Sequence, residues 1–447
     1  MNTDFAYWFD RCGLSKKEFA RRVAQQAQTH GLPHVRTAAS RVRGWLTGQQ
    51  PVELAEVIAE VVTEACGEPV RAADLGFRTA RPSDDRPVAD ALDRHCRADL
   101  IVRKAIDGAG SVDLVSGPTL VENAERVSLG RSVVPMTGGR VGGRHVAQVS
   151  AATTIFRQWD NTYGGGLRRK AVVGQLSEVV PLLHGPFTDE RTGCALFAAV
   201  ADLAQLAGWM SFDLALDATA QRYYLLALRL ASDAGDRAQV ARMLYCLARQ
   251  MIELDRPRDA LDLTGLALYV THRARMPRVT AMLRVMEGRA YACLGDATGC
   301  DRALGLAADA FSSNGSDPAW SEFFDETELA GVTGVALRDL AVRDSPNSAR
   351  HAARARPWIA QAATGRSRAF LRSRVLDLAG LALVDLLLDE PHAALSSGRQ
   401  ALEQAGAVNS SRVERNLSQL AATAADRYPS IRAVREFDGR VRKVLPG

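Results

Sequence analysis

Apolar residues recur every three to four positions along most of the chain, whereas the alternation typical of strands is rare. Near the N-terminus this spacing predicts four helices, at 2–12, 16–29, 37–46 and 52–66. Gly13 ends the first helix, and Ser15 with Glu18 forms the pattern of a capping box for the second. The first 77 residues are therefore expected to form a compact helical domain.

The next segment has a different composition. Residues 78–86 are polar and contain proline, as linkers do, and a helix is expected over 88–107. Residues 108–144 are rich in glycine and serine and are expected to form a flexible loop with one short helix near 121–128. Residues 78–144 are thus predicted to connect two domains.

From residue 145 the helical pattern continues to the end, beginning with a helix pair (145–163 and 167–184) joined at three glycines. Residues 254–261 match residues 388–395 in five of eight places, and Leu294 and Leu216 occupy the same slot. The spacings of 38 and 40 residues indicate repeated helix pairs, and the gap from 294 to 388 leaves room for one longer pair around Leu340. The whole chain is therefore predicted to be all-α, with 145–447 forming a superhelical array.

Composition places few limits on function. A chain of 447 residues is too long to fold around a single hydrophobic core, so more than one domain is expected. Its contents of 47% hydrophobic and 24% charged residues are ordinary for a globular protein. The seven cysteines include no CxxC pair, so we expect buried thiols in a reducing cytoplasm. We found no signal-peptide pattern and no apolar stretch of about 18 residues, so no membrane partner is expected.

Charge is segregated within the first domain. The net charge of +5 is modest, so only a local cluster can indicate a nucleic-acid site. Glu18 is the one acid between residues 11 and 47, a stretch that carries eight basic residues: Arg11, Lys16, Lys17, Arg21, Arg22, Arg36, Arg41 and Arg43. The following helix is acidic instead, with Glu53, Glu56, Glu60, Glu64 and Glu68. This segregation suits contact with a phosphate backbone, although a solvated surface would show it too.

The phase of the 37–46 helix sharpens this prediction. Val42, Trp45 and Leu46 share one face with Ala38 and Ala39, and should pack against Phe19, Val23 and the fourth helix. A recognition helix needs such a seam, with short polar and arginine side chains facing outward. The predicted base contacts are Ser40, Arg41, Arg43 and Gly44, and the predicted phosphate contacts are Lys16, Lys17, Arg36, Thr37 and Thr47.

These residues resemble the Cro/repressor-like (XRE) helix-turn-helix domain. The resemblance rests on Leu14–Arg22 and on the ending formed by Val42, Trp45, Gly48 and Pro51. It implies a domain that reads double-stranded DNA in its major groove. The link from Thr29 to Thr37 is longer than the tight turn usual in that family.

The rest of the chain is similar to actinobacterial regulators that append a tetratricopeptide-like array to such a domain. The similarity rests on the stretches 203–209, 255–261 and 324–331. It implies a cytoplasmic regulator of development or secondary metabolism whose repeat domain dimerises and senses an effector. The effector can be a peptide, a small molecule or a protein.

Other candidate chemistry is sparse. No histidine cluster has metal-ligand spacing, and the glycine-rich stretch 138–143 lacks the phosphate-loop pattern, so we expect neither metal nor cofactor. Aromatic and acidic residues of the array are candidates for a ligand or partner groove, although aromatic residues in repeats are more often core: Trp209, Tyr224, Trp320, Asp325 and Glu328.

The sequence therefore predicts a DNA-binding transcriptional regulator that binds its operator as a homodimer and responds to an effector. An alternative is an interaction scaffold that does not bind specific DNA. An enzyme is disfavoured, because no usual catalytic motif is present. The operator, the effector, the sign of regulation and the dimer surface are not predicted.

Overall fold

The chain forms two compact units, residues 1–87 and 88–447, each described here by itself. A computed structural model describes residues 2–29, 37–49, 51, 54–66, 70, 75–77, 88–101, 120, 124, 141–166 and 168–445. Within these residues the regular elements are all helical, and the one β-bridge is the isolated pair Val141 and Phe187. The predicted all-α class is confirmed.

The described residues of the first unit form four α-helices: α1 (Thr3–Arg11), α2 (Lys16–Thr29), α3 (Ala39–Leu46) and α4 (Ala55–Cys66). They pack around an aromatic core in which the Phe5 ring lies 4.7 Å from Phe77 and 5.9 Å from Phe19, between ring centroids. Asn2 caps α1 by accepting a hydrogen bond from Phe5 N, and its side-chain amide donates to the Leu75 carbonyl. The start and the end of this unit are thereby joined.

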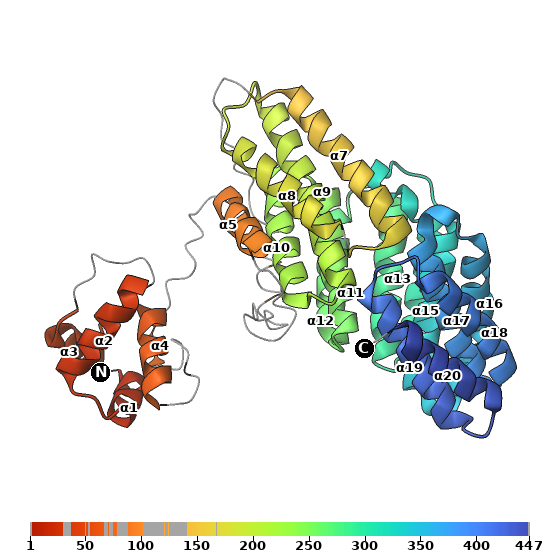
Figure 1. The fold of residues 1–447 in the computed structure, drawn as a ribbon. Helices are drawn as coiled ribbons and strands as arrows, with labels where there is room; N and C mark the ends of the chain where they lie inside the picture. The colour runs from red at the N-terminus through yellow and green to blue at the C-terminus, as the bar shows by residue number, and fades with distance from the viewer. Residues whose placement is uncertain are drawn as a thin grey trace. The chain divides into compact units, whose positions relative to one another are not determined.

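The second unit is a stack of helix pairs (Figure 1). Its helices are α5 (Val88–Ile101), α7 (Gly143–Tyr163), α8 (Arg169–Val179), α9 (Glu190–Asp213), α10 (Asp217–Asp233), α11 (Arg237–Glu253), α12 (Pro257–Thr271), α13 (Pro277–Cys293), α14 (Ala297–Phe311), α15 (Glu326–Arg343), α16 (Ser348–Gly365), α17 (Leu371–Leu387), α18 (Pro391–Ala405), α19 (Ser411–Arg427) and α20 (Arg432–Val444). Short 3-10 turns occur at η2 (Val180–His184), η3 (Ala319–Phe323), η4 (Ser345–Asn347) and η5 (Arg368–Phe370). Each helix from α9 onward packs on its partner, and the first helix of each pair packs on that of the next. This is the predicted helical-repeat packing.

The turns inside the pairs explain the sequence repeat. Asp255, Gly295 and Asp389 have positive φ angles of 57°, 75° and 60°, and each stands two residues before a second helix begins. Asp and Gly tolerate this left-handed conformation better than most residues. The recurring Leu-Asp and Leu-Gly pairs therefore mark the turn that reverses the chain.

One register in the predicted repeat was wrong. The residue equivalent to Leu254 and Leu294 is Leu214, because Ala215 has the positive φ (59°) and α10 begins at Asp217. The spacing is then 40 residues in both intervals. The longer pair around Leu340 is α15 and α16, whose turn is lengthened by η4.

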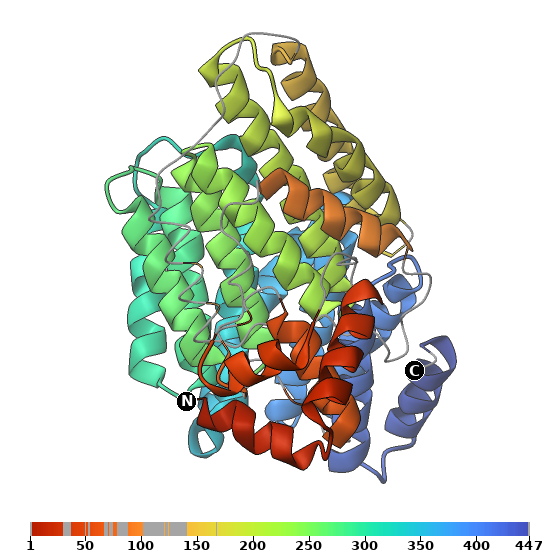
Figure 2. The ribbon, with the colours of Figure 1, turned by 90° about the vertical axis from the view of Figure 1, so that its left-hand side faces the viewer.

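Residues 102–107 of the helix predicted at 88–107 lie outside the described residues, and the rest of that helix is not an isolated connector. It is described from Val88 to Ile101 and packs on α8, η2 and α10, crossing them on the outside of the unit (Figure 2). Leu92 and Cys96 are buried in this contact. Of the predicted loop at 108–144, the structure describes residues 141–144 and the buried Leu120 and Ala124, whereas most of the proposed 121–128 helix and the glycines at 138 and 139 lie outside the described residues. The end of this loop was predicted wrongly, because α7 begins at Gly143 and Val141 pairs with Phe187.

The superhelix closes on itself, which the sequence analysis did not foresee. α7 packs on α17 and η5, and Asn409 N donates to the Tyr163 carbonyl at 2.9 Å. Gly164 and Gly166 make this approach possible, since a Cβ at Gly164 would lie 2.4 Å from the Asn409 carbonyl oxygen and one at Gly166 would lie 2.1 Å from Asn409 Cγ. The first pair and the last pairs thus face a common interior.

Candidate nucleic-acid interface and interior cavity

The exposed face of α3 is the first candidate site. Val42 and Trp45 are buried in the core with Phe19 and Val23 behind them, as the helical phase predicted, and Leu46 is partly buried. Ala38 is exposed and precedes the helix, which begins at Ala39. The predicted base-contact residues Ser40, Arg41 and Arg43 are exposed.

Gly44 has a local packing role. A Cβ there would lie 2.1 Å from Oε1 of Gln49, so the Gln49 side chain occupies the space beside the glycine. Gln49 N and Thr47 Oγ1 both donate to the Gly44 carbonyl at 2.9 Å. The glycine therefore allows a tight turn at the end of α3, while Thr47 remains exposed.

The start of α2 carries the other predicted contacts. Ser15 Oγ accepts from Glu18 N at 3.2 Å, so the predicted cap is formed, and Lys16 and Lys17 are exposed beside it. The Glu18 carboxylate binds Arg21, which lowers its pKa to about 2 with help from Arg22. Two of the eight clustered basic residues are thus paired with the one acid.

The remaining predicted contacts differ in how far the structure describes them. Thr37 is partly buried, and its hydroxyl oxygen is buried without a partner among the described residues. Arg36 lies outside the described residues. On α4 Glu60 and Glu64 are exposed, so the predicted separation of basic and acidic helices holds where side chains are described.

The second candidate site is a cavity of about 540 Å³ inside the superhelix. Its wall draws on α7, α9, α11, α17 and α19, so both ends of the array contribute. A second cavity of about 310 Å³ shares Arg249, Glu328, Ser373, Leu376 and Arg412 with the first. The two cavities are therefore neighbours that share part of their walls.

The predicted groove residues divide between this space and other places. Trp209, Trp320 and Glu328 line the larger cavity. Tyr224 is fully buried in the core against Gly208, and Asp325 is exposed and caps α15 by accepting from Glu328 N at 2.8 Å.

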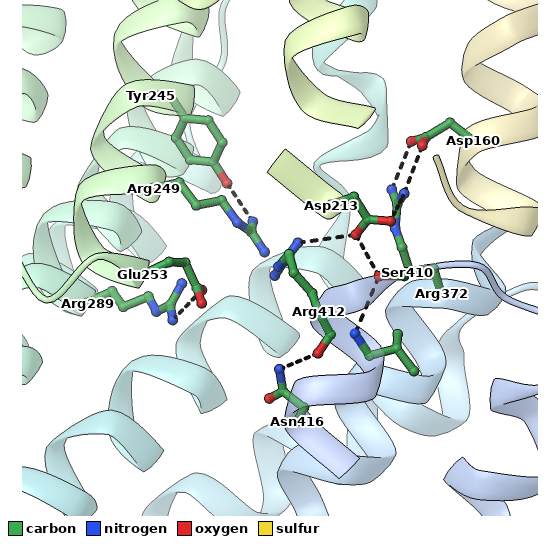
Figure 3. A network of polar contacts seen from close by, with 11 residues as sticks. Asp160, Asp213, Tyr245, Arg249, Glu253, Arg289, Arg372, Ser410, Arg412 and Asn416 are labelled. Carbon is green, nitrogen blue, oxygen red and sulfur yellow. Dashed lines mark hydrogen bonds and ion pairs between the residues drawn. The ribbon is translucent and has the colours of Figure 1, made fainter. Parts of the chain in front are cut away.

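The charged residues of this interior that sequence reasoning missed are arginines. Arg372 donates two hydrogen bonds of 2.9 Å to Asp160, which is 212 positions away in the sequence (Figure 3). It donates one more, of 3.3 Å, to Asp213, which is 159 positions away. Arg242 and Arg157 both bind Asp202. Because 51 of the 56 basic residues are arginine, none of these stands out in the sequence.

Comparisons with known proteins give one result, in the first unit. The model of a family described as the SP15 N-terminal domain matches residues 5–78. No curated protein and no solved structure matches the chain. The match covers the four-helix unit and is less than half of the chain.

Two further features bear on what the second unit can bind. One described helix, α9, has the length and composition of a membrane span, but 72% of its apolar window is buried against other helices. Among the described residues, no three His, Cys, Asp or Glu side chains are grouped so as to hold a metal ion.

Proposed function

We propose that this protein is a sequence-specific DNA-binding transcriptional regulator whose first unit reads DNA with α3. The observation that carries the proposal is the division of α3 into two faces. Val42 and Trp45 fix one face in the core, and Ser40, Arg41 and Arg43 are exposed on the other. Arginines held in this way can bind guanine edges in the major groove with two hydrogen bonds each.

The start of α2 supports contact with the DNA backbone. Lys16 and Lys17 are exposed in its first turn, where the helix dipole favours an anion. Phosphate contacts of this kind position a reader and carry no sequence information.

The second unit is proposed to dimerise and to sense an effector in its interior. Readers of this type usually bind paired half-sites, which requires two copies. The cavity wall joins α7 and α9 to α17 and α19, so an effector bound there contacts both ends of the array. By stabilising one arrangement of α7 and α9 against α17 and α19, the effector would shift the dimer between a form that binds DNA and a form that does not.

The test is a fluorescence-anisotropy titration of the full chain with DNA from upstream of its own gene and with random duplex, at several salt concentrations. Arg41→Ala with Arg43→Ala should weaken binding to the specific DNA by roughly 30-fold or more, at about 1–3 kcal/mol for each bidentate contact. Lys16→Gln with Lys17→Gln should weaken binding to both DNAs. About two fewer ions should be released on binding, so the affinity should depend less steeply on salt concentration.

A matched control is Arg435→Ala with Arg440→Ala, which removes the same charge from exposed positions of α20. It should leave both affinities near wild type. Equal weak binding to both DNAs, unchanged by the α3 substitutions, would favour the scaffold without specific DNA binding.

A further inference from the structure

Among the described residues that line the larger cavity, Arg249 and Arg412 are the two arginines that donate no hydrogen bond to a carboxylate. Arg412 lies 4.0 Å from Asp213 and 5.0 Å from the centre of the Phe212 ring. Arg249 contacts the Tyr245 hydroxyl at 3.4 Å and lies 5.2 Å from the centre of the Trp209 ring. The Nε atoms of both are buried without a hydrogen-bond partner. Figure 3 shows the two guanidinium groups close to one another in the middle of the network.

The neighbouring acids are already paired with other arginines. Glu253 accepts from Arg289 at 3.0 Å, and Glu328 accepts from Arg366. Asp213 accepts from Arg372 at 3.3 Å and from the Ser410 hydroxyl at 2.8 Å. None of these carboxylates is hydrogen-bonded to Arg249 or Arg412, on which they act only over longer distances.

Burial makes the charged form of Arg412 less favourable. Its side chain is 6% exposed, and burial together with the charge of Arg249 lowers its pKa to about 10. A buried cation without a hydrogen-bonded anion is strongly disfavoured, so its retention in a cavity wall points to an anion that enters the cavity.

The rest of the wall indicates the body of the ligand. Trp209, Trp320, Phe323 and Leu376 supply apolar surface, and the Trp320 indole N–H is buried without an acceptor. Cavities of roughly 300–1,000 Å³ hold small molecules, and arginine forks match the planar oxygens of carboxylate and phosphate.

We propose that the interior cavity binds a small molecule bearing a carboxylate or phosphate group, with its anionic end held by Arg249 and Arg412. This deepens the sensing part of the proposed function by naming the chemical class of the effector. Anion binding is measured without DNA, so the inference and the DNA-binding proposal can fail separately.

The experiment measures thermal unfolding of the full chain in inorganic phosphate, in benzoate and in neutral benzyl alcohol, with ionic strength matched by chloride. Phosphate or benzoate should raise the melting temperature of wild type above the chloride reference, and benzyl alcohol should not. A response to one anion and not to the other identifies which group is bound.

Arg412→Met is the decisive variant. It removes a buried charge that has no hydrogen-bonded anion while keeping most of the side-chain volume, so without an added anion the protein should melt at or above the wild-type temperature. Its affinity for the anion should fall about tenfold or more, as expected for loss of charge-assisted hydrogen bonds. The matched control is Arg289→Met, which leaves Glu253 and Asp339 without their partner and should lower the melting temperature.

Three results would overturn the inference. The first is equal anion responses in wild type and Arg412→Met, which indicates salt effects on the surface. The second is no response of wild type to either anion. The third is a loss of stability in Arg412→Met as large as that in Arg289→Met, which shows that Arg412 is already balanced within the fold.

Discussion

The two units place the same residue type in opposite environments. In the first unit Arg41 and Arg43 are exposed on α3, above a core that is apolar and aromatic. In the second unit Arg242, Arg289 and Arg372 are buried and face carboxylates across the interior. Exposed arginines can be removed with little effect on folding, whereas buried ones are part of the fold, so the two sets should respond differently to substitution.

The largest expected effect is at Arg372, which connects α17 to α7 and α9. Arg372→Ala leaves Asp160 and Asp213 as buried acids without their main partner and should lower the free energy of unfolding by about 3–5 kcal/mol. Denaturant unfolding of the full chain measures this. Exposed Arg435→Ala should change stability by less than about 0.5 kcal/mol, and similar values for both variants would contradict the comparison.

A smaller effect is expected at the closure of the superhelix. Gly164 has a φ of 77° and a ψ of 174°, and a Cβ there would clash with the Asn409 carbonyl. Gly164→Ala should therefore destabilise the protein by about 1–3 kcal/mol or more.

The matched control is Gly174→Ala, inside α8, where a Cβ meets nothing within 4 Å. It should stabilise the protein by about 0.5–1 kcal/mol. Hydrogen exchange should rise in α7 and α19 of the Gly164 variant only. Equal exchange in both variants would show that the glycine does not hold the closure.

The smallest effect concerns pH and contrasts two carboxylates. Arg21 and Arg22 lower the pKa of Glu18 to about 2, so the stability from this pair is present above its usual pKa of 4.5 and lost as pH falls toward 2. Burial raises the pKa of Asp377 from 3.8 to about 6 despite its bond to Arg366. The raised pKa of Asp377 therefore lowers the free energy of unfolding above pH 6, and this loss becomes smaller as the pH falls from 6 toward 4.

Unfolding at pH 7 and pH 5 separates these cases. The gain in stability on lowering the pH to 5 should be smaller in Asp377→Asn than in wild type, whereas Glu18→Gln should leave that gain unchanged. An Asp377→Asn variant with the full wild-type gain would show that this carboxyl does not titrate in the range.

The helices and their pairing were predictable because their signals are local. Helical spacing located α2 and α4, and the Leu-Asp turns at 254 and 388 located the repeat. The repeat position predicted for Leu216 belongs to Leu214, two residues earlier, because Ala215 and not Asp217 takes the left-handed conformation. A turn composed of alanine and leucine carries no distinctive signal.

The interior site was only partly predictable. Trp209, Trp320 and Glu328 were selected as residue types suited to a groove, and they line the cavity. The closure depends on Asp160 and Arg372, which are 212 residues apart, and no local pattern connects them. The glycines after α7 were interpreted as a helix break, whereas their small size also serves the contact with Asn409.

The most direct test of the central claim is photo-crosslinking of the full chain to its own upstream DNA. Benzoylphenylalanine replaces exposed Ser40 on α3 in one variant and exposed Glu64 on the acidic helix α4 in the other. We expect a crosslink from position 40 that random DNA does not compete away, and none from position 64. Crosslinks from both positions at equal yield, or from position 64 alone, would contradict the assignment of α3 as the DNA reader.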